Sequence, residues 1–260
     1  LMMYHFVKQA LAPVSLQLRH EGIEYSFYGD TFADLLLVSD APEKLMGLTW
    51  KWTARARNGE VFGSGTGKAE ISPLDVMALA QIRVNPPQAL ISGPVIVELV
   101  LSNSTGQVIS ERFCVFGAKG VRAPLRGLVK DAAGHNGYGM PYVTTAICGG
   151  KVEPAELNIE EKRAFVRGEC EFFEVILKNS GSMTAIFVEI KPTLEYRTDL
   201  FIDNNFAFIP PGESRIIAIR ALVREGLSLP ETGWNVTCWN AEGLTIPPAD
   251  SILLYMGRRD

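Results

Sequence analysis

The sequence predicts an all-β protein made of two antiparallel β-sandwiches in tandem, preceded by a short helix. Apolar and polar residues alternate over many short runs, which is typical of strands with one buried face. Clusters of Gly, Pro, Asn and Asp separate these runs, as expected of turns between strands. A glycine-rich stretch with little periodicity, residues 118–151, divides the strand pattern into two parts and predicts a linker.

The chain begins with a short helical pattern in residues 1–13, which ends at Pro13 because proline cannot continue a helix. A helix with no element before it is interpreted as the remnant of a preceding domain, so the chain is expected to be cut from a longer protein. From Val14 the period changes to two, and the first strands are predicted at residues 14–18, 23–27 and 32–38.

A longer strand is predicted at residues 48–56, where alternation places Trp50 and Trp52 on one face. The following Asn58-Gly59 predicts a hairpin turn, because both residues tolerate a positive φ. The glycine-rich residues 63–68 are interpreted as a hairpin or edge loop. They do not match a phosphate-binding loop, because the spacing differs and no helix follows.

The first part of the chain has the strand number of an immunoglobulin-like sandwich. Further strands are predicted at residues 76–84, 95–101 and 107–116, with a turn at residues 103–106 between the last two. Residues 14–117 therefore hold about seven short strands, which is the number that this fold requires.

The second part, residues 152–260, repeats the pattern and predicts a second immunoglobulin-like sandwich. Residues 197–215 form a strand–turn–strand unit, because Pro210-Pro211-Gly212-Glu213 fits a turn and cannot continue a central strand. The next strand is predicted at residues 216–219. The remaining strands of this part are predicted at residues 155–159, 164–167, 171–177, 185–190, 235–240 and 251–256.

Composition excludes two classes of partner. A net charge of −4 offers no basic surface for nucleic acid. No apolar run approaches the ~20 residues of a membrane helix, so neither nucleic acid nor a membrane is expected as a partner. Cysteines without CxxC pairs or nearby histidines predict free, half-buried thiols and no metal site. These cysteines are Cys114, Cys148, Cys170 and Cys238.

Few residues are candidates for chemistry. Glu169, Glu171 and Glu174 are close in sequence, but a solvated strand face explains them better than the paired carboxylates of a glycosidase. His5 and His20 are isolated, and the glycines around His135 (residues 132–139) fit a linker better than a ligand loop. We therefore expect no catalytic, cofactor-binding or metal-binding residue and no cofactor.

The tryptophans leave two interpretations open. Trp50 and Trp52 share a strand face and suit either a sandwich core or a sugar-stacking platform, and the core is favoured. Trp234 and Trp239 are five positions apart, which is an odd spacing. A regular strand would therefore place them on opposite faces, with one of them exposed.

Three segments together resemble the C-terminal region of a family 2 glycoside hydrolase, in particular the β-mannosidase and exo-glucosaminidase branch. The first is YHFVKQALAPV at residues 4–14, which is similar to the helix and exit that lead from the barrel into a β-domain. The second is LVSD at residues 37–40, followed by a strand with Trp50 and by Asn58-Gly59. The third is DNNF at residues 203–206, followed by PGES at residues 211–214.

The resemblance implies a piece of an enzyme that lacks the chemistry of its parent. In that family the catalytic glutamates sit on a (β/α) barrel of about 250 residues, and no such repeat occurs in this sequence. The chain is then expected to brace the barrel of a β-mannosidase-like parent and to have the rest of that enzyme as its partner. The alternative is a free-standing carbohydrate-binding or adhesion module. An independent hydrolase is not expected.

Overall fold

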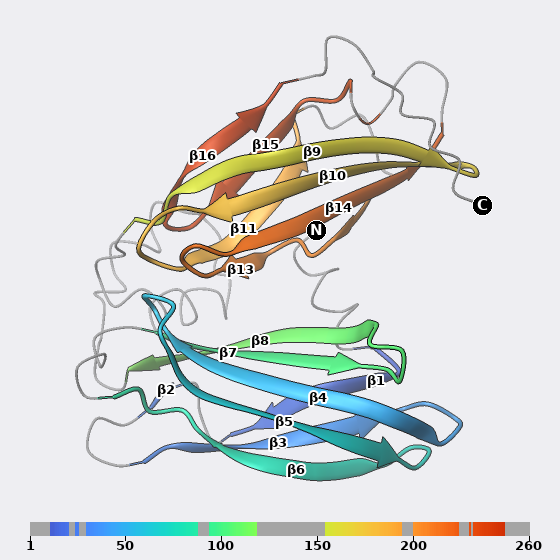
Figure 1. Ribbon diagram of the computed structural model, residues 1–260, viewed down its shortest axis with the longest axis vertical. Helices are drawn as coiled ribbons and strands as arrows, with labels where there is room; N and C mark the ends of the chain where they lie inside the picture. The colour runs from blue at the N-terminus through green and yellow to red at the C-terminus, as the bar shows by residue number, and fades with distance from the viewer. Residues whose placement is uncertain are drawn as a thin grey trace, which may run out of the picture. The chain divides into compact units, whose positions relative to one another are not determined.

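The computed structural model describes residues 11–20, 24–25, 30–87, 94–118, 154–193, 200–223, 229 and 231–247 (Figure 1). Every regular element in these ranges is a strand, and the strands form four sheets. This confirms the predicted all-β class with tandem sandwiches. None of the described residues belongs to a helix long and apolar enough to cross a membrane. Residues 1–10 of the helix predicted in residues 1–13, and the strand predicted at residues 251–256, lie outside the described residues; residues 11–13 are not helical.

The chain divides into two compact units, Leu1–Val152 and Glu153–Asp260. In the first, a three-stranded sheet has the order β1-β3-β6, and a five-stranded sheet has the order β2-β8-β7-β4-β5. Neighbours are antiparallel except for β2 and β8. The strands are β1 (Val14–Arg19), β2 (Glu24–Tyr25), β3 (Phe32–Ser39), β4 (Leu45–Ala56), β5 (Val61–Ile71), β6 (Val76–Arg83), β7 (Val95–Ser102) and β8 (Val108–Ala118).

The core of the first unit follows from the alternation seen in the sequence. In β3, Leu35 and Leu37 are buried and alternate with less buried neighbours. They join Val97 and Leu99 of β7 and Phe116 of β8 in one apolar cluster. Residues from both sheets therefore meet in a single core, as the period-two pattern requires.

The prediction of a hairpin or edge loop at residues 63–68 is wrong, because these residues form the centre of the 11-residue edge strand β5. Gly65 pairs with Trp52, and Gly67 pairs with Trp50, on the neighbouring strand β4. A Cβ added at Gly65 would lie 2.5 Å from Nε1 of Trp52, so the indole rests on the glycine backbone. Glycine weakens a strand by itself, but an aromatic ring on the neighbouring strand compensates by covering it.

Trp50 and Trp52 are half-buried and pack against the core of the first unit. This confirms the core interpretation favoured from the sequence. The glycines of β5 provide the flat surface that both indoles need.

Replacing Gly67 with alanine is expected to lower the free energy of unfolding of the first unit by about 1–3 kcal/mol. The new Cβ would lie 2.5 Å from Cζ2 of Trp50, and the ring has to shift. Urea unfolding followed by tryptophan fluorescence measures the loss. Gly243→Ala is the control, because its Cβ would meet only the carbonyl oxygen of Val236, at 3.4 Å. Equal losses in both variants would contradict the packing argument.

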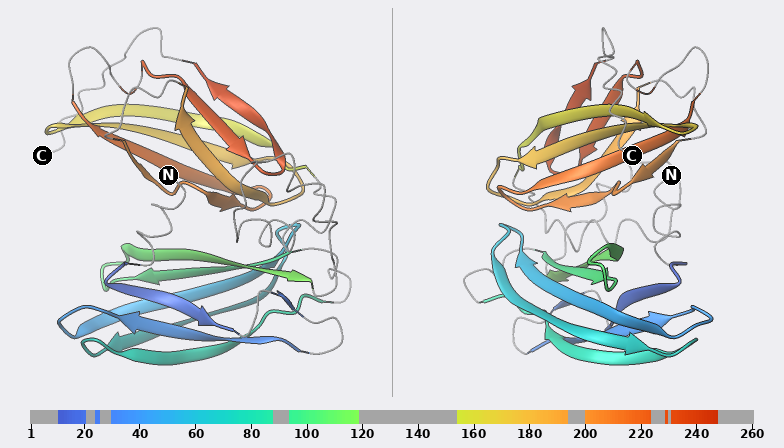
Figure 2. Two further views of the ribbon diagram at one scale, coloured as in Figure 1. Left: turned by 180° about the vertical axis from the view of Figure 1, so that it is seen from behind. Right: turned by 45° about the vertical axis from the view of Figure 1, so that its right-hand side comes forward.

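The second unit likewise contains two sheets, here of four strands each, which Figure 2 shows as separate layers. One sheet has the order β12-β14-β10-β9, and the other has the order β13-β11-β15-β16. All paired strands are antiparallel. The strands are β9 (Leu157–Arg167), β10 (Cys170–Asn179), β11 (Ala185–Pro192), β12 (Phe201–Asp203), β13 (Ala207–Ile209), β14 (Ser214–Leu222), β15 (Trp234–Cys238) and β16 (Ala241–Ile246).

Two strands of the second unit, β9 and β16, differ from the sequence-based prediction. The strands expected at residues 155–159 and 164–167 are one continuous strand, β9, whose register against β10 shifts at Ile176/Leu177. The charged residues between them interrupt the alternation at this irregularity. Strand β16 was not predicted, because its sequence AEGLTI offers little apolar pattern.

Buried asparagines complete the backbone hydrogen bonding around β11. Asn205, from the DNNF segment, accepts a hydrogen bond from the amide of Ile190 at 2.8 Å and donates to its carbonyl at 3.1 Å. Asn240 accepts from the amide of Ile186 and donates to the carbonyl of Thr184, both at 2.9 Å. Each side chain thereby supplies the donor and acceptor of a neighbouring strand, which buried backbone groups require.

Candidate functional site

The carboxylates considered from the sequence do not converge on one site. Glu169 is exposed, and Glu174 is half-buried on the outer side of β10. Glu171 corrects an expectation, because it is only 7% exposed and not on a solvated face. It occupies the inward register of β10, and its Oε2 accepts a hydrogen bond from the amide of Leu229 at 2.7 Å. Its role in this arrangement is structural.

The histidines and cysteines considered from the sequence do not form a functional site in the described residues either. No group of His, Cys, Asp and Glu in the described ranges is arranged to hold a metal ion. His20 packs edge-on against Phe116, with ring centroids 5.0 Å apart. Burial raises the pKa of Cys114 to about 11, which disfavours the nucleophilic thiolate. The glycine-rich loop with His135 lies outside the described residues, as do His5 and Cys148.

The other two described cysteines match the expectation from the sequence. Cys170 and Cys238 are free and half-buried in strands, as is Cys114.

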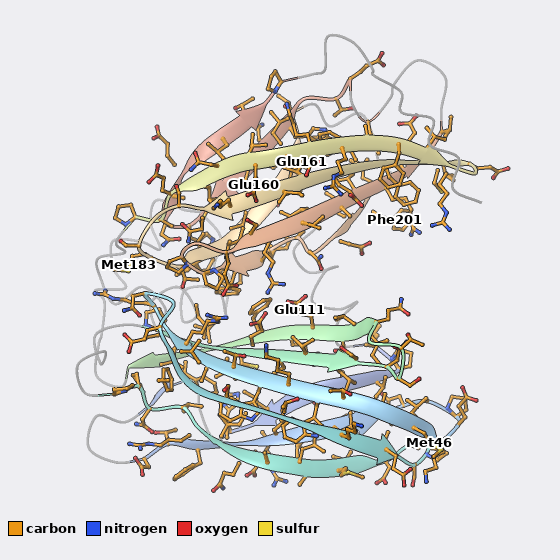
Figure 3. The ribbon with its side chains drawn as sticks, viewed as in Figure 1. Met46, Glu111, Glu160, Glu161, Met183 and Phe201 are labelled. Atoms are coloured by element: carbon orange, nitrogen blue, oxygen red, sulfur yellow. The ribbon has the colours of Figure 1, made fainter. Side chains whose placement is uncertain are left out.

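An aromatic row crosses the outer face of the sheet β12-β14-β10-β9. Phe201, Arg220, Phe172 and Phe165 are successive cross-strand partners on its four strands. Phe165 and Phe172 stack with centroids 5.0 Å apart and planes at 5°. The guanidinium carbon of Arg220 lies 5.2 Å from the ring centroid of Phe201, a cation–π geometry. Figure 3 shows Phe201 near one end of this sheet.

Several large apolar side chains on this face are open to solvent, between charged residues such as Glu174 and Arg220. Phe201 is 45% exposed, Ile216 44% and Leu222 49%, although all three are large apolar side chains. Open apolar clusters of this kind mark interaction surfaces more often than single exposed side chains do. We call the set the aromatic face; it consists of Phe165, Phe172, Phe201, Ile216, Arg220 and Leu222.

One ion pair lies beside the aromatic face on the edge strand β9. Arg163 Nε is 2.7 Å from Oε1 of Glu161, and the hydrogen bonds from this guanidinium hold the pKa of Glu161 below its usual value. Both side chains are exposed, so solvent screens the pair and it contributes little to stability. The guanidinium of Arg163 is therefore already paired with a carboxylate of its own strand.

The outer face of the other sheet, β13-β11-β15-β16, is mixed. Trp239 lies 4.2 Å from Phe187, centroid to centroid, and Phe187 lies 4.9 Å from Phe208. Polar side chains continue from this cluster along β11, β15 and β16. We call the set the Trp239 face; it consists of Phe187, Glu189, Lys191, Asn235, Thr237, Trp239 and Thr245.

The two tryptophans of this region separate as the odd spacing predicts. Trp234 is fully buried in the core and stacks on Phe173 at 5.8 Å. Trp239 is half-buried and contacts Phe187 on the outer side. The sequence does not reveal which of the two is buried, because each is followed by an asparagine in a similar local sequence.

Known structures share this fold. An exo-chitosanase from Amycolatopsis orientalis matches with a TM-score of 0.61 and 16% identity, over 94% of this chain and 27% of that chain. A β-D-mannosidase from Dictyoglomus thermophilum matches with a TM-score of 0.57 and 14% identity, over 92% of this chain and 23% of that chain. The chain thus spans about a quarter of the length of these enzymes. No protein-family model and no curated protein matches the sequence.

The likeness bears out the resemblance drawn from the sequence. In fold, the chain resembles a C-terminal region of family 2 glycoside hydrolases. Identities of 14–16% establish the fold alone.

Proposed function

We propose that this chain is a non-catalytic β-sandwich region of a β-mannosidase-like glycoside hydrolase, where it braces the catalytic barrel and forms domain or subunit contacts. The observation that carries the proposal is the coverage of the structural likeness. It takes in 94% of this chain but only 27% of the exo-chitosanase, so most of such an enzyme has no counterpart in this chain.

The aromatic face supports a bracing role. Its large apolar side chains are already about half covered, so each gains roughly 1 kcal/mol when a partner covers the rest. Phe201, Ile216 and Leu222 lie on two adjacent strands, β12 and β14, so one flat partner surface can cover them together. Such a surface suits a contact with another domain.

The described carboxylates support a non-catalytic role. A retaining glycosidase places two carboxyl groups about 5–5.5 Å apart in a cleft. Glu171 is buried under the sheet, whereas Glu174 lies on its outer side, so these two cannot form such a pair.

The purified chain is expected to release no p-nitrophenol from p-nitrophenyl β-mannoside or β-glucosaminide above the rate in buffer. The parallel control is an intact family 2 β-mannosidase at the same molar concentration. Turnover that rises in proportion to the concentration of the chain, and that persists after further purification, would overturn the proposal.

The aromatic face is expected to bind a hydrophobic fluorescent dye. Phe201→Asp combined with Ile216→Asp should reduce dye fluorescence at least about twofold, because it places charge on an exposed apolar surface. Val108→Asp is the matched control, since Val108 is 52% exposed on the first unit. Stability should change by less than about 1 kcal/mol in each case. An unchanged dye signal in the double variant would contradict a role for this face.

A further inference from the structure

A pocket opens at one end of the five-stranded sheet of the first unit, where β4 and β5 meet the turn between β7 and β8. Its volume is about 430 Å³, within the range of small-molecule sites. Every residue that lines it is a glycine or a polar residue, and Lys68, Thr49, Ser102 and Ser104 contribute an ammonium and three hydroxyls. We call it the Lys68 pocket. Figure 3 marks this end of the first unit with Met46.

The register of three strands brings the ammonium and two of the hydroxyls into one row. Thr49 of β4 pairs with Lys68 of β5 on one side and with Ser102 of β7 on the other. Directly paired residues project from the same side of a sheet, with Cβ atoms about 4.5–5.5 Å apart. The next residue, Trp50, packs against the core, so the row lies on the outer side of the sheet.

The wall beside this row is held by contacts within the chain. Gly47 has φ = 67° and lies in an irregularity of β4, and a Cβ added to it would lie 2.9 Å from Cβ of Ser104. The strand therefore rests directly on the turn. Within the turn, Oδ1 of Asn103 accepts hydrogen bonds from the amides of Thr105 and Gln107, both at 3.0 Å. The hydroxyl of Ser104 is thus positioned before any ligand arrives, which lowers the cost of binding.

The charge of Lys68 is not neutralised within the part of the chain that the structure describes. No ion pair there includes Lys68, whereas Glu70, two positions further along β5, is paired with Lys44 at 3.0 Å. No carboxylate lines the pocket either. A cation is therefore repelled by this site, and a neutral ligand would leave the ammonium without a counter-charge.

We propose that the Lys68 pocket binds a tetrahedral oxyanion group, the phosphate or sulfate of a free ion or of a small monoester. The ammonium of Lys68 supplies the charge and up to three donors, and the hydroxyls of Thr49, Ser102 and Ser104 donate to the remaining oxygens. The net charge of the chain is −4, so the attraction for an anion is local to this pocket. This inference does not depend on the proposed place of the chain in a larger hydrolase.

Amide NMR spectra of the intact chain, recorded during titration with inorganic phosphate, inorganic sulfate and phenyl phosphate, test the proposal. The ionic strength is held constant with sodium chloride. Resonances of residues 47–49, 67–69 and 102–106 are expected to shift, with a Kd of about 1–10 mM. Phenyl phosphate that binds at least about threefold more tightly than inorganic phosphate assigns the pocket to an ester. Equal or weaker binding of phenyl phosphate assigns it to the free ion.

Two variants remove the proposed contacts. Lys68→Gln should weaken the binding of each probe at least about tenfold, because the hydrogen bonds to a charged donor are lost. Thr49→Val keeps the shape of the side chain without its hydroxyl and should weaken binding about threefold.

Lys51→Gln is the matched control, because Lys51 is an exposed lysine two positions from Thr49 on the same side of β4 but does not line the pocket. It should leave the affinity unchanged, and the same spectra establish that each variant is folded. The absence of shifts at these residues with all three probes at about 50 mM would overturn the proposal. Shifts that persist with equal affinity in Lys68→Gln, or that are lost equally in Lys51→Gln, would overturn it as well.

Discussion

Trp234→Ala is expected to lower the free energy of unfolding of the second unit by about 3–5 kcal/mol. Trp234 is fully buried and stacks on Phe173 with centroids 5.8 Å apart. Its Nε1 donates to the carbonyl of Leu229 at 3.3 Å, and the amide of Leu229 donates to Glu171. The substitution therefore leaves a large cavity and removes a donor from a buried carbonyl. Urea unfolding with circular dichroism as the probe measures the loss.

Trp239→Ala is the matched control, because it deletes the same side chain in the turn that directly follows β15. Trp239 is half-buried and packs on Phe187 outside the core, so the loss should stay near 1 kcal/mol. A comparable loss in the two variants would show that the core of the second unit does not centre on Trp234.

Asn179→Ala is expected to lower the free energy of unfolding of the second unit by about 2–4 kcal/mol, since each buried group left without a partner costs about 1–3 kcal/mol. Asn179 is fully buried. Its Nδ2 donates to the carbonyls of Met183 at 2.7 Å and Ile209 at 2.8 Å, and its Oδ1 accepts from the amide of Gly181 at 3.0 Å. Oδ1 also accepts from the amide of Glu156 at 3.4 Å, so the substitution takes the side-chain partner from four backbone groups. Thermal and urea unfolding should agree on the loss.

Asn158→Ala provides the comparison for this prediction. Asn158 is an exposed asparagine on β9 whose Nδ2 donates to Oγ of Ser180 at 2.6 Å. Water replaces that bond when the side chain is removed, so the loss should be below about 0.5 kcal/mol. If Asn179→Ala were as mild as Asn158→Ala, the buried amide would not be a structural link between β10 and β13.

Much of the architecture could be predicted because local chemistry and tertiary structure agree. Alternation in β3 gives the buried Leu35 and Leu37, and the turn predicted at residues 210–213 connects β13 to β14. The exposed Asp203 ends β12, and the exposed Glu213 lies in the predicted turn before β14. A pattern with a period of two reflects which side chains face the core, so the burial that it predicts agrees with the burial in the structure.

The failures have a common cause in contacts between distant residues. Gly63, Gly65 and Gly67 are weak strand formers, and they form a strand only because the indoles of Trp50 and Trp52 on β4 cover them. Glu171 is a carboxylate in a core register, and the amide of Leu229, 58 residues later, donates a hydrogen bond to it. Strand propensity depends on cross-strand neighbours, which a linear pattern does not contain.

The candidate surfaces show the same limit. The sequence indicates that Trp234 and Trp239 face opposite ways, but the pairing of β15 with β11 decides which one is buried. Phe165, Phe172 and Phe201 are unremarkable in the linear sequence and become one row only through the register of four strands.

By itself the sequence determined the all-β class and the resemblance to the C-terminal region of family 2 glycoside hydrolases, because alternation and turn chemistry are local properties. The tertiary structure alone decided which aromatic residues are buried and which lie together on an open face. It did so because these properties depend on sheet order and register. Phe187 and Trp239, for example, are 52 residues apart in the chain, yet the centroids of their rings lie 4.2 Å apart in the structure.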